Sequence, residues 1–525
     1  MGKTKSRSIT LLKYHSIFPI IKKIKAAEAV QTRSLKEDSV KDQHPQLNLI
    51  LLAFIMVLSL GLNLWNNNFP IYYHLDEAKK VFFIQHAVQD FNHPILMLQI
   101  VRVFKTIFSN IDIILLGRGL SAVFGMLIVL LSYLISKRTL GSKYALFVSL
   151  ATALSPIMVI HSHYLKEDVF ATCFMLLSVY SLLEFIRQEN KYNVILLGIS
   201  TGLACSAQYK AFLLLALYLF CPFIVPSLIN AKKDYFKKLL LVYSLAFITF
   251  CMVNWPIFLN SNIFIKGLLF ETHHVIEGHD VKFYPIAHFF SFHLFNSIIP
   301  GITLPLALLA LACIVFTLAR WKSALWQDKV LIAYVALFYF SAEFSPLKPY
   351  PDFMRYMIPI VPVLLYFACA LMQKTESSIN LKRNLCITCF MGLVLLPSFH
   401  DTVLLDYYLV RDTRVKLEEW LATSGEKVLC ERYAKTRTTL SQKDISLAEV
   451  DIEKAKRHHF TYLVASSFYY DRFYKGALLE GEPQRVYQYY ERYQELFNRP
   501  YVEIKPAFKS FAFSNPTIRI IKLGY

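Results

Sequence analysis

Residues 47-LNLILLAFIMVLSLGLNLW-65 are followed directly by 66-NNNFPIYYHLDEA-78. A helix needs about 20 apolar residues to cross the hydrocarbon of a membrane, because every backbone polar group must be bonded internally there. The first stretch has this length and composition. The second returns to polar residues and ends in two adjacent carboxylates. The sequence therefore predicts a first membrane span that opens onto an acidic loop.

Apolar runs of similar length recur along the chain. They lie at 113–135, 144–161, 169–186, 193–208, 211–229, 238–258, 297–319, 329–345, 356–372 and 384–399. Hydrophobic residues make up 55% of the 525 residues and charged residues only 18%, whereas soluble domains carry about 25% charged residues. We therefore expect an all-α polytopic membrane bundle of about eleven transmembrane helices.

The net charge of +19 raises nucleic-acid binding as an alternative. Most Lys and Arg residues, however, fall in short gaps between apolar runs, where they indicate topology and contact with anionic lipid. We therefore expect no nucleic-acid partner. Eight of the nine cysteines lie in apolar segments, which favours plain packing over metal or redox chemistry.

The Lys and Arg bias also predicts orientation, because basic residues accumulate in cytoplasmic loops. The basic loops alternate along the chain and agree on a cytoplasmic N-terminus. An odd number of spans then places residues 400–525 outside the cytoplasm. We expect an integral protein of the plasma membrane, the inner membrane if the source is bacterial.

The domain organisation follows from these assignments. We expect a basic cytoplasmic segment over 1–46, a transmembrane domain over 47–399 with large outer loops at 66–112 and 259–296, and an extracytoplasmic α/β domain over 400–525. Segments 78–90 and 95–108 of the first loop are typical of amphipathic helices that lie along the interface. In the tail we expect helices near 412–423 and 484–496 and strands near 426–431, 461–466, 501–505 and 516–522.

The first candidate site is the pair Asp76-Glu77. Adjacent carboxylates at the mouth of a bundle can act as a general base or bind a metal. The alternative is an acidic helix start with the aspartate as N-cap. A second candidate, Lys166-Glu167-Asp168, opens the fourth run; ionisable groups at membrane depth are costly and therefore functional candidates, although a snorkelling interfacial cluster is equally consistent.

Several cations occur on the same expected side: Arg102, Arg118, Lys210, Lys348 and Arg355. Converging cations suit a phosphate, which arginine can bind in bidentate fashion, and any one of them could instead contact a lipid headgroup. His273-His274 with His279-Asp280 could ligate a metal, but the spacing matches no standard zinc signature. A loop that shapes a substrate site is the alternative.

Together these features resemble the GT-C superfamily of integral membrane glycosyltransferases, and in particular the bacterial relatives of protein O-mannosyltransferases (glycosyltransferase family 39) and of the lipid A aminoarabinose transferase. The motifs that carry the resemblance are Asp76-Glu77, His93-Pro94, Arg118-Gly119-Leu120-Ser121, Tyr164 to Asp168, Gly278-His279, Lys348 with Arg355-Tyr356, and Asp412-Thr413-Arg414. Relatives often have a Lys-Tyr pair after the fifth helix. This chain has Tyr209-Lys210 in the opposite order.

The resemblance implies transfer of a hexose or pentose from a polyprenyl-phosphate donor to an acceptor hydroxyl on a glycan, lipid or protein, with inversion. Asp76 would be the base, with Glu77 beside it. The implied donor-phosphate ligands are Lys166, Arg355 and Lys348, followed by Arg118 and Lys210. Asp168, Glu167, His279 and His93 would orient the acceptor or a cation; a divalent ion is possible, and no other cofactor is expected.

Two other functions stay open. A transporter or flippase of lipid-linked sugars would show internal repeats and ionisable residues near the bilayer midplane, whereas the charges here cluster at helix ends. A non-catalytic sensor would act through the tail, whose aromatic patches at 468–470 and 487–490 could bind partners or pack the domain onto the bundle.

Overall fold

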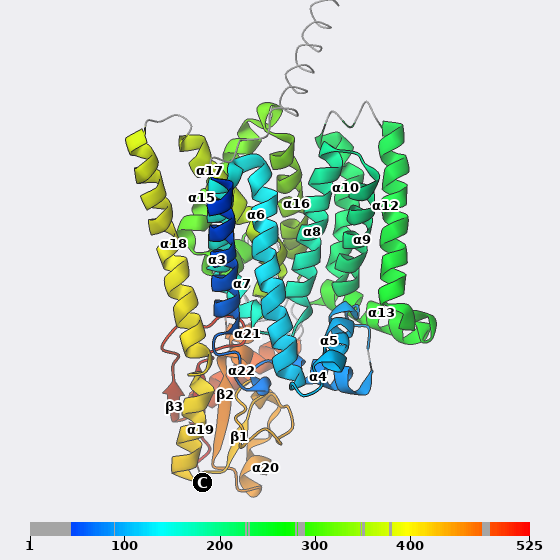
Figure 1. Ribbon diagram of the computed structural model, residues 1–525. Helices are drawn as coiled ribbons and strands as arrows, with labels where there is room; N and C mark the ends of the chain where they lie inside the picture. The colour runs from blue at the N-terminus through cyan, green and yellow to red at the C-terminus, as the bar shows by residue number, and fades with distance from the viewer. Residues whose placement is uncertain are drawn as a thin grey trace, which may run out of the picture.

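The computed structural model describes residues 44–88, 90–225, 228, 232–278, 281, 289–346, 348, 352–376, 381–474 and 484–524. Long helices run side by side and form a bundle, and a small domain with a β-sheet covers one end of it (Figure 1). The bundle helices are α3 (Pro45–Leu64), α6 (Ile113–Ala153), α7 (Pro156–Ser162), α8 (Glu167–Arg187), α9 (Lys191–Ala207), α10 (Leu213–Ile224), α12 (Lys232–Val253), α14 (Ile299–Ile302), α15 (Leu304–Ala319), α16 (Trp326–Phe344), α17 (Val361–Glu376) and α18 (Leu381–Leu409).

Six helical segments of the described chain are long and apolar enough to cross a membrane, or seven if α14 and α15, which meet at a sharp bend, count as part of one span. Each predicted apolar run falls on a helix, but the expected count of about eleven spans is not confirmed. Two runs share the 41-residue helix α6. Gly141 breaks it with a φ of 73°, a left-handed conformation that glycine adopts without steric penalty.

Three amphipathic helices lie at the end of the bundle that the sheet domain covers: α4 (Leu75–His86), α5 (Leu96–Ile107) and α13 (Ser261–Glu277) (Figure 1). The first two match the helices expected in the first outer loop. The N-cap of α4 is His74, whose Nδ1 accepts a hydrogen bond from the Asp76 backbone N–H at 3.3 Å. The acidic helix start of the alternative interpretation is therefore confirmed, because Asp76 and Glu77 lie in the first turn of α4. Its aspartate N-cap was wrong, and the Asp76 carboxylate remains available for other contacts.

The C-terminal domain contains the α/β elements expected from the sequence. Its four-stranded sheet has the order β1-β2-β4-β3, where β1 is Val428–Cys430, β2 Tyr462–Ser466, β3 Tyr501–Ile504 and β4 Ile518–Lys522. Strand β1 is parallel to β2, and the other two pairings are antiparallel. The helices are α19 (Thr413–Ser424), α20 (Ile452–Arg457), α21 (Ser467–Tyr474) and α22 (Gln484–Phe497).

A buried ion pair attaches this domain to the first outer loop. Arg414 and Asp412 are fully buried and paired at 2.8 Å. The Arg414 guanidinium lies 3.7 Å from the centre of the Tyr73 ring and donates to the Tyr73 carbonyl oxygen at 3.4 Å. The Phe513 ring packs 4.1 Å from the His74 ring. The domain therefore contacts the residues that immediately precede Asp76.

Candidate functional site

A cavity of about 390 Å³ lies where the loops and short helices at one end of the bundle meet the C-terminal domain. It is lined by His74, Asp76, Lys79, Lys80, Asp90, His93, Lys166, Gln208, Lys210, Phe270, Glu271, His274, Arg355, Tyr356, Arg432, Tyr433, Arg472 and Phe513, among others. Five of the residues expected from the sequence therefore share one cavity: Asp76, His93, Lys166, Lys210 and Arg355. They come from segments that are up to 279 positions apart, from 76 to 355.

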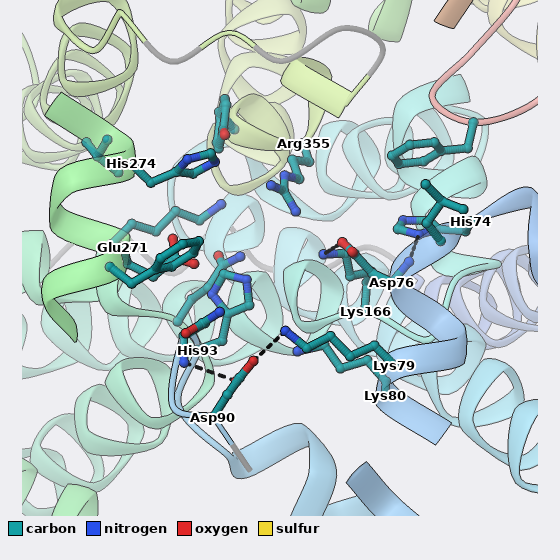
Figure 2. Close-up of a pocket in the computed structure, with 18 of the residues that line it drawn as sticks. His74, Asp76, Lys79, Lys80, Asp90, His93, Lys166, Glu271, His274 and Arg355 are labelled. Atoms are coloured by element: carbon teal, nitrogen blue, oxygen red, sulfur yellow. Dashed lines mark hydrogen bonds and ion pairs between the residues drawn. The ribbon is translucent and has the colours of Figure 1, made fainter. Parts of the chain in front are cut away.

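Asp76 and Lys166 form the centre of the site. The Lys166 Nζ lies 2.5 Å from the Asp76 Oδ2 (Figure 2). Lys166 is the N-cap residue of α8, and its side chain is almost completely buried, whereas 46% of the Asp76 side chain is exposed to the cavity. Burial alone would raise the pKa of Asp76, but the charge of Lys166, with help from His74 and Arg355, holds it well below its usual range. Asp76 is therefore ionised.

Two further cations approach the same cavity. Arg355 belongs to η7 (Asp352–Ile360), and its charge acts on Asp76. Lys210 belongs to η2 (Tyr209–Phe212), and its Nζ lies 3.7 Å from the Asp168 Oδ1, which also accepts from the Gln208 amide at 2.7 Å. Asp168 itself is buried behind the cavity wall. The reversed order Tyr209-Lys210 thus still brings the lysine to the site.

Glu77 and Arg118 do not line this cavity; they form a buried pair inside the bundle. The Glu77 carboxylate accepts from Arg118 at 2.9 Å and 2.5 Å and from the Leu165 backbone N–H at 2.8 Å. Arg118 also donates to the carbonyl oxygens of Asn67 and Phe69 at 3.0 Å and 2.7 Å. This network connects α4, α6 and the residue before Lys166. It therefore fixes the distance between Asp76 on α4 and Lys166.

A second layer of charges supports the floor of the cavity. Lys80 forms an ion pair with the buried Glu167, and Lys79 pairs with Asp90 at 2.5 Å (Figure 2). Burial among these groups lowers the pKa of His93 to about 4, so this histidine is neutral near pH 7. A neutral imidazole can accept or donate a hydrogen bond without adding charge.

Lys348, an expected phosphate ligand, is not among the described residues that line the cavity. The Lys348 Nζ donates to the carbonyl oxygens of Ala342, Glu343 and Ser345 at the end of α16, at 3.3, 3.1 and 2.5 Å. Burial lowers the pKa of Lys348 to about 8. Its contacts are those of a C-terminal helix cap. His279 lies outside the described residues.

Helix α13 and the C-terminal domain also line the cavity. Glu271 and His274 project from α13 and face Asp76 and Lys166 across the cavity (Figure 2). His274 belongs to the histidine group that the sequence offered either as metal ligands or as part of a loop that shapes a substrate site. Burial raises the pKa of Glu271, and this residue was not predicted. The C-terminal domain adds two arginines and two aromatic residues to the wall, which were not predicted either.

A second, more apolar cavity of about 550 Å³ adjoins the first, and His93, Gln208, Lys210, Glu271 and Tyr356 line both. Its remaining wall comes mostly from apolar side chains of η2, α10, α13 and α16, including Phe212, Leu213, Ala216, Leu268, Ile276 and Phe338. A charged chamber therefore opens into a groove between helices that suits a hydrocarbon chain.

The described residues contain no group of three or more His, Cys, Asp and Glu side chains that could hold a metal ion. Asp76, Asp90, Glu167 and Asp168 each have a lysine partner instead. The donor set of the described site thus does not fit a divalent cation.

Comparison with known proteins identifies the architecture. Residues 92–255 match the family model described as dolichyl-phosphate-mannose-protein mannosyltransferase. A search of curated protein sequences finds no match. Among solved structures, the chain is similar to ArnT from Cupriavidus metallidurans bound to undecaprenyl phosphate, with 12% identity, a TM-score of 0.53, and coverage of 90% of this chain and 97% of that one.

The chain is also similar to the archaeal oligosaccharyltransferase AglB from Archaeoglobus fulgidus in complex with an inhibitory peptide and a dolichol-phosphate. Identity is 12%, the TM-score is 0.54, and the match covers 90% of this chain and 75% of that one. At such identities the likeness concerns the fold. The family match and the shared architecture together point to the GT-C glycosyltransferase superfamily, as the sequence motifs indicated.

Proposed function

We propose that this protein is a membrane glycosyltransferase that moves a sugar from a polyprenyl-phosphate donor to an acceptor hydroxyl. One observation carries the proposal: an ionised carboxylate, Asp76, faces Lys166, Lys210 and Arg355 in a cavity that continues into an apolar groove. A base, a phosphate-binding cluster and a channel for a lipid tail are the three parts that this reaction needs. The structural neighbours contain undecaprenyl phosphate and dolichol-phosphate, which is consistent with such a donor.

The donor fits the two cavities in one direction. Its isoprenoid tail occupies the apolar groove beside α13, and its phosphate lies near Lys210 and Arg355, at the boundary of the two cavities. These cations stabilise the negative charge that develops on the leaving phosphate as the glycosidic bond breaks. The sugar then lies in the charged chamber, between the phosphate and Asp76.

The chemical step is a single displacement. Asp76 accepts the proton of the acceptor hydroxyl, the acceptor oxygen forms a bond to the anomeric carbon, and the bond from that carbon to the phosphate oxygen breaks. Polyprenyl phosphate leaves with the electron pair, and attack from the opposite face inverts the configuration. Because Lys166 contacts Asp76, a nearby donor phosphate competes for Lys166 and makes the carboxylate more basic.

The other residues at or near the cavity act through these groups. Glu77 and Arg118 hold α4 against α6 and against the residue before Lys166, and Glu167 and Asp168 position Lys80 and Lys210. His93 and Glu271 lie where the sugar would sit and can accept or donate hydrogen bonds to its hydroxyls. Lys348 caps α16 near the groove.

The location of the reaction follows from the distribution of basic residues. The cytoplasmic loops predicted from Lys and Arg bias lie at the end of the bundle opposite the C-terminal domain. We therefore propose that the cavity opens outside the cytoplasm, on the outer face of the plasma membrane. A lipid-linked donor suits this compartment because no nucleotide-sugar motif is present in the chain.

The experiment uses a deletion strain that lacks the protein, with and without a plasmid that carries the wild-type or a variant copy. Mass spectrometry of envelope glycans, lipids and glycoproteins should reveal a sugar that is missing in the deletion strain. The wild type and Asp234→Asn, a control at an exposed site in α12, should restore it. Asp76→Asn should lower its formation by about 10²–10⁴-fold, the range expected for loss of a general base.

Two results would contradict the proposal. If Asp76→Asn restores the sugar as well as the wild type, Asp76 is not the base. If purified protein in vesicles moves the lipid-linked sugar across the bilayer without forming a glycosidic product, the protein is a flippase.

A further inference from the structure

The C-terminal domain supplies a distinct wall to the charged cavity. Its lining residues are Arg432 and Tyr433, which follow β1, Arg472 in α21, and Phe513. Two of these are cations and two are aromatic, and the described lining contains no carboxylate from this domain. The bundle, in contrast, contributes both lysines and acids to its side of the cavity.

The positions of these side chains are fixed by contacts within the domain. Arg472 is only 5% exposed, donates to the Tyr433 hydroxyl at 3.0 Å, and lies 5.0 Å from the centre of the Tyr469 ring. Tyr433 in turn stacks on Phe513 at 6.0 Å. A guanidinium held this way is preorganised, so binding an anion costs little side-chain entropy.

The described lining of the cavity is rich in cations. It holds seven: Lys79, Lys80, Lys166, Lys210, Arg355, Arg432 and Arg472. It holds three acids, Asp76, Asp90 and Glu271, and three more acids, Glu167, Asp168 and Asp444, pair with lining cations from outside the lining. Seven cations against six acids leave a surplus of one positive charge, which matches the single negative charge of a donor phosphodiester. The case for a second anion therefore rests on the placement of the two arginines beside Tyr433 and Phe513.

We propose that the acceptor is an anionic glycan, bearing a carboxylate or phosphate close to the hydroxyl that receives the sugar, and that Arg432 and Arg472 bind this group. The inference rests on the proposed function and names its acceptor class. Arginine binds carboxylate and phosphate groups with paired, charge-assisted hydrogen bonds. Tyr433 and Phe513 present the apolar surface on which a sugar ring packs. The acceptor thus enters from the side of the C-terminal domain, and the donor enters from the membrane.

The test measures binding, so that it does not depend on turnover. Full-length protein in lipid nanodiscs is first saturated with undecaprenyl phosphate to fill the donor site. It is then titrated with octyl β-glucuronide, which carries a carboxylate, and with octyl β-glucoside, its neutral counterpart. The variants are Arg432→Gln and Arg472→Gln, and the matched control is Arg457→Gln, an exposed arginine of α20 outside the cavity lining.

The wild type and the Arg457→Gln control should bind the glucuronide at least about tenfold more tightly than the glucoside, as expected for one charge-assisted contact. Arg432→Gln and Arg472→Gln should each remove most of this preference and leave undecaprenyl phosphate binding unchanged. Arg472→Lys, which keeps the charge, should retain part of the preference for the glucuronide. This variant separates the effect of the positive charge from that of a folded domain alone.

Equal binding of the two glycosides by the wild type would overturn the inference. So would a loss of undecaprenyl phosphate binding in the arginine variants, because the arginines would then belong to the donor site. A charge preference in a protein that transfers no sugar would leave the anion site intact and count against the proposed transferase instead. Failure of the two proposals can therefore be distinguished.

Discussion

Replacing Glu77 with methionine should lower the stability of the helical bundle, because Glu77 acts through packing and not in the sugar-transfer step. The Glu77 side chain is completely buried and accepts three hydrogen bonds, two of them from Arg118. Arg118 is only 1% exposed, so the substitution leaves its charge buried without this carboxylate. Breaking a buried pair from one side typically costs about 3–5 kcal/mol.

This free energy converts to a modest change in melting temperature. With an unfolding entropy of about 2.1 cal/mol/K per residue, a chain of 525 residues loses about one degree for each kcal/mol. Glu77→Met should therefore melt about 3–5 °C below the wild type. Asp234→Asn, at an exposed site in α12, serves as the control and should stay within about 1 °C.

The assay is thermal unfolding of purified protein in nanodiscs of constant lipid composition, followed by tryptophan fluorescence. A double-mutant cycle with Arg118→Met isolates the pair: the double variant should be less destabilised than the sum of the single variants by about 1–3 kcal/mol. The reasoning is refuted if Glu77→Met melts with the wild type and yet loses sugar transfer, because Glu77 would then act in the chemistry.

Three further predictions concern other contacts. Gly267→Ala should lower both the melting temperature and the rate of sugar transfer, because the added Cβ would overlap backbone atoms of the loop before α5. Gly119→Ala, with open space around it, should leave both quantities unchanged. Equal melting temperatures of the two variants would contradict the close packing of α13. Burial holds the pKa of Lys348 near 8 in the fold against 10.5 in the unfolded chain, so the melting temperature of the wild type relative to Lys348→Met should rise as pH increases from about 8 to 10.5; a flat or falling difference would count against it. Arg414→Met leaves the buried Asp412 carboxylate without its arginine. The C-terminal domain of this variant should be cleaved in limited proteolysis at protease concentrations that leave the wild type intact. An unchanged digestion pattern would show that the ion pair does not hold the domain on the bundle.

The sequence predicted the helical segments and the tail well, because both follow from local patterns. Apolar runs near 20 residues and alternating short strands depend on neighbouring residues, and the expected strand at 461–466 matches β2 within a residue. The number of spans was harder to predict. A helix such as α6 joins two apolar runs through one glycine, and length and composition alone do not show which helices cross a membrane.

The candidate site was predictable only in part. The sequence identified Asp76 and Lys166 and the end of the bundle at which they lie. It could not separate Asp76 from Glu77, because neighbouring helix positions point about 100° apart and only the packed structure decides which one faces the cavity. The arginines of the C-terminal domain were missed because their role depends on how that domain docks, through contacts between residues more than 300 positions apart such as Tyr73 and Arg414.

In the proposed transferase, the attachment of the C-terminal domain beside Asp76 separates two tasks. The bundle carries the proposed base and the apolar groove, whereas the facing wall of the cavity comes from a small sheet domain that could diverge on its own. Specificity for new acceptors could then evolve by exchange of surface residues in that domain, with the catalytic residues of the bundle unchanged. Grafting the tail of one relative onto the helices of another becomes a practical route to altered glycan products.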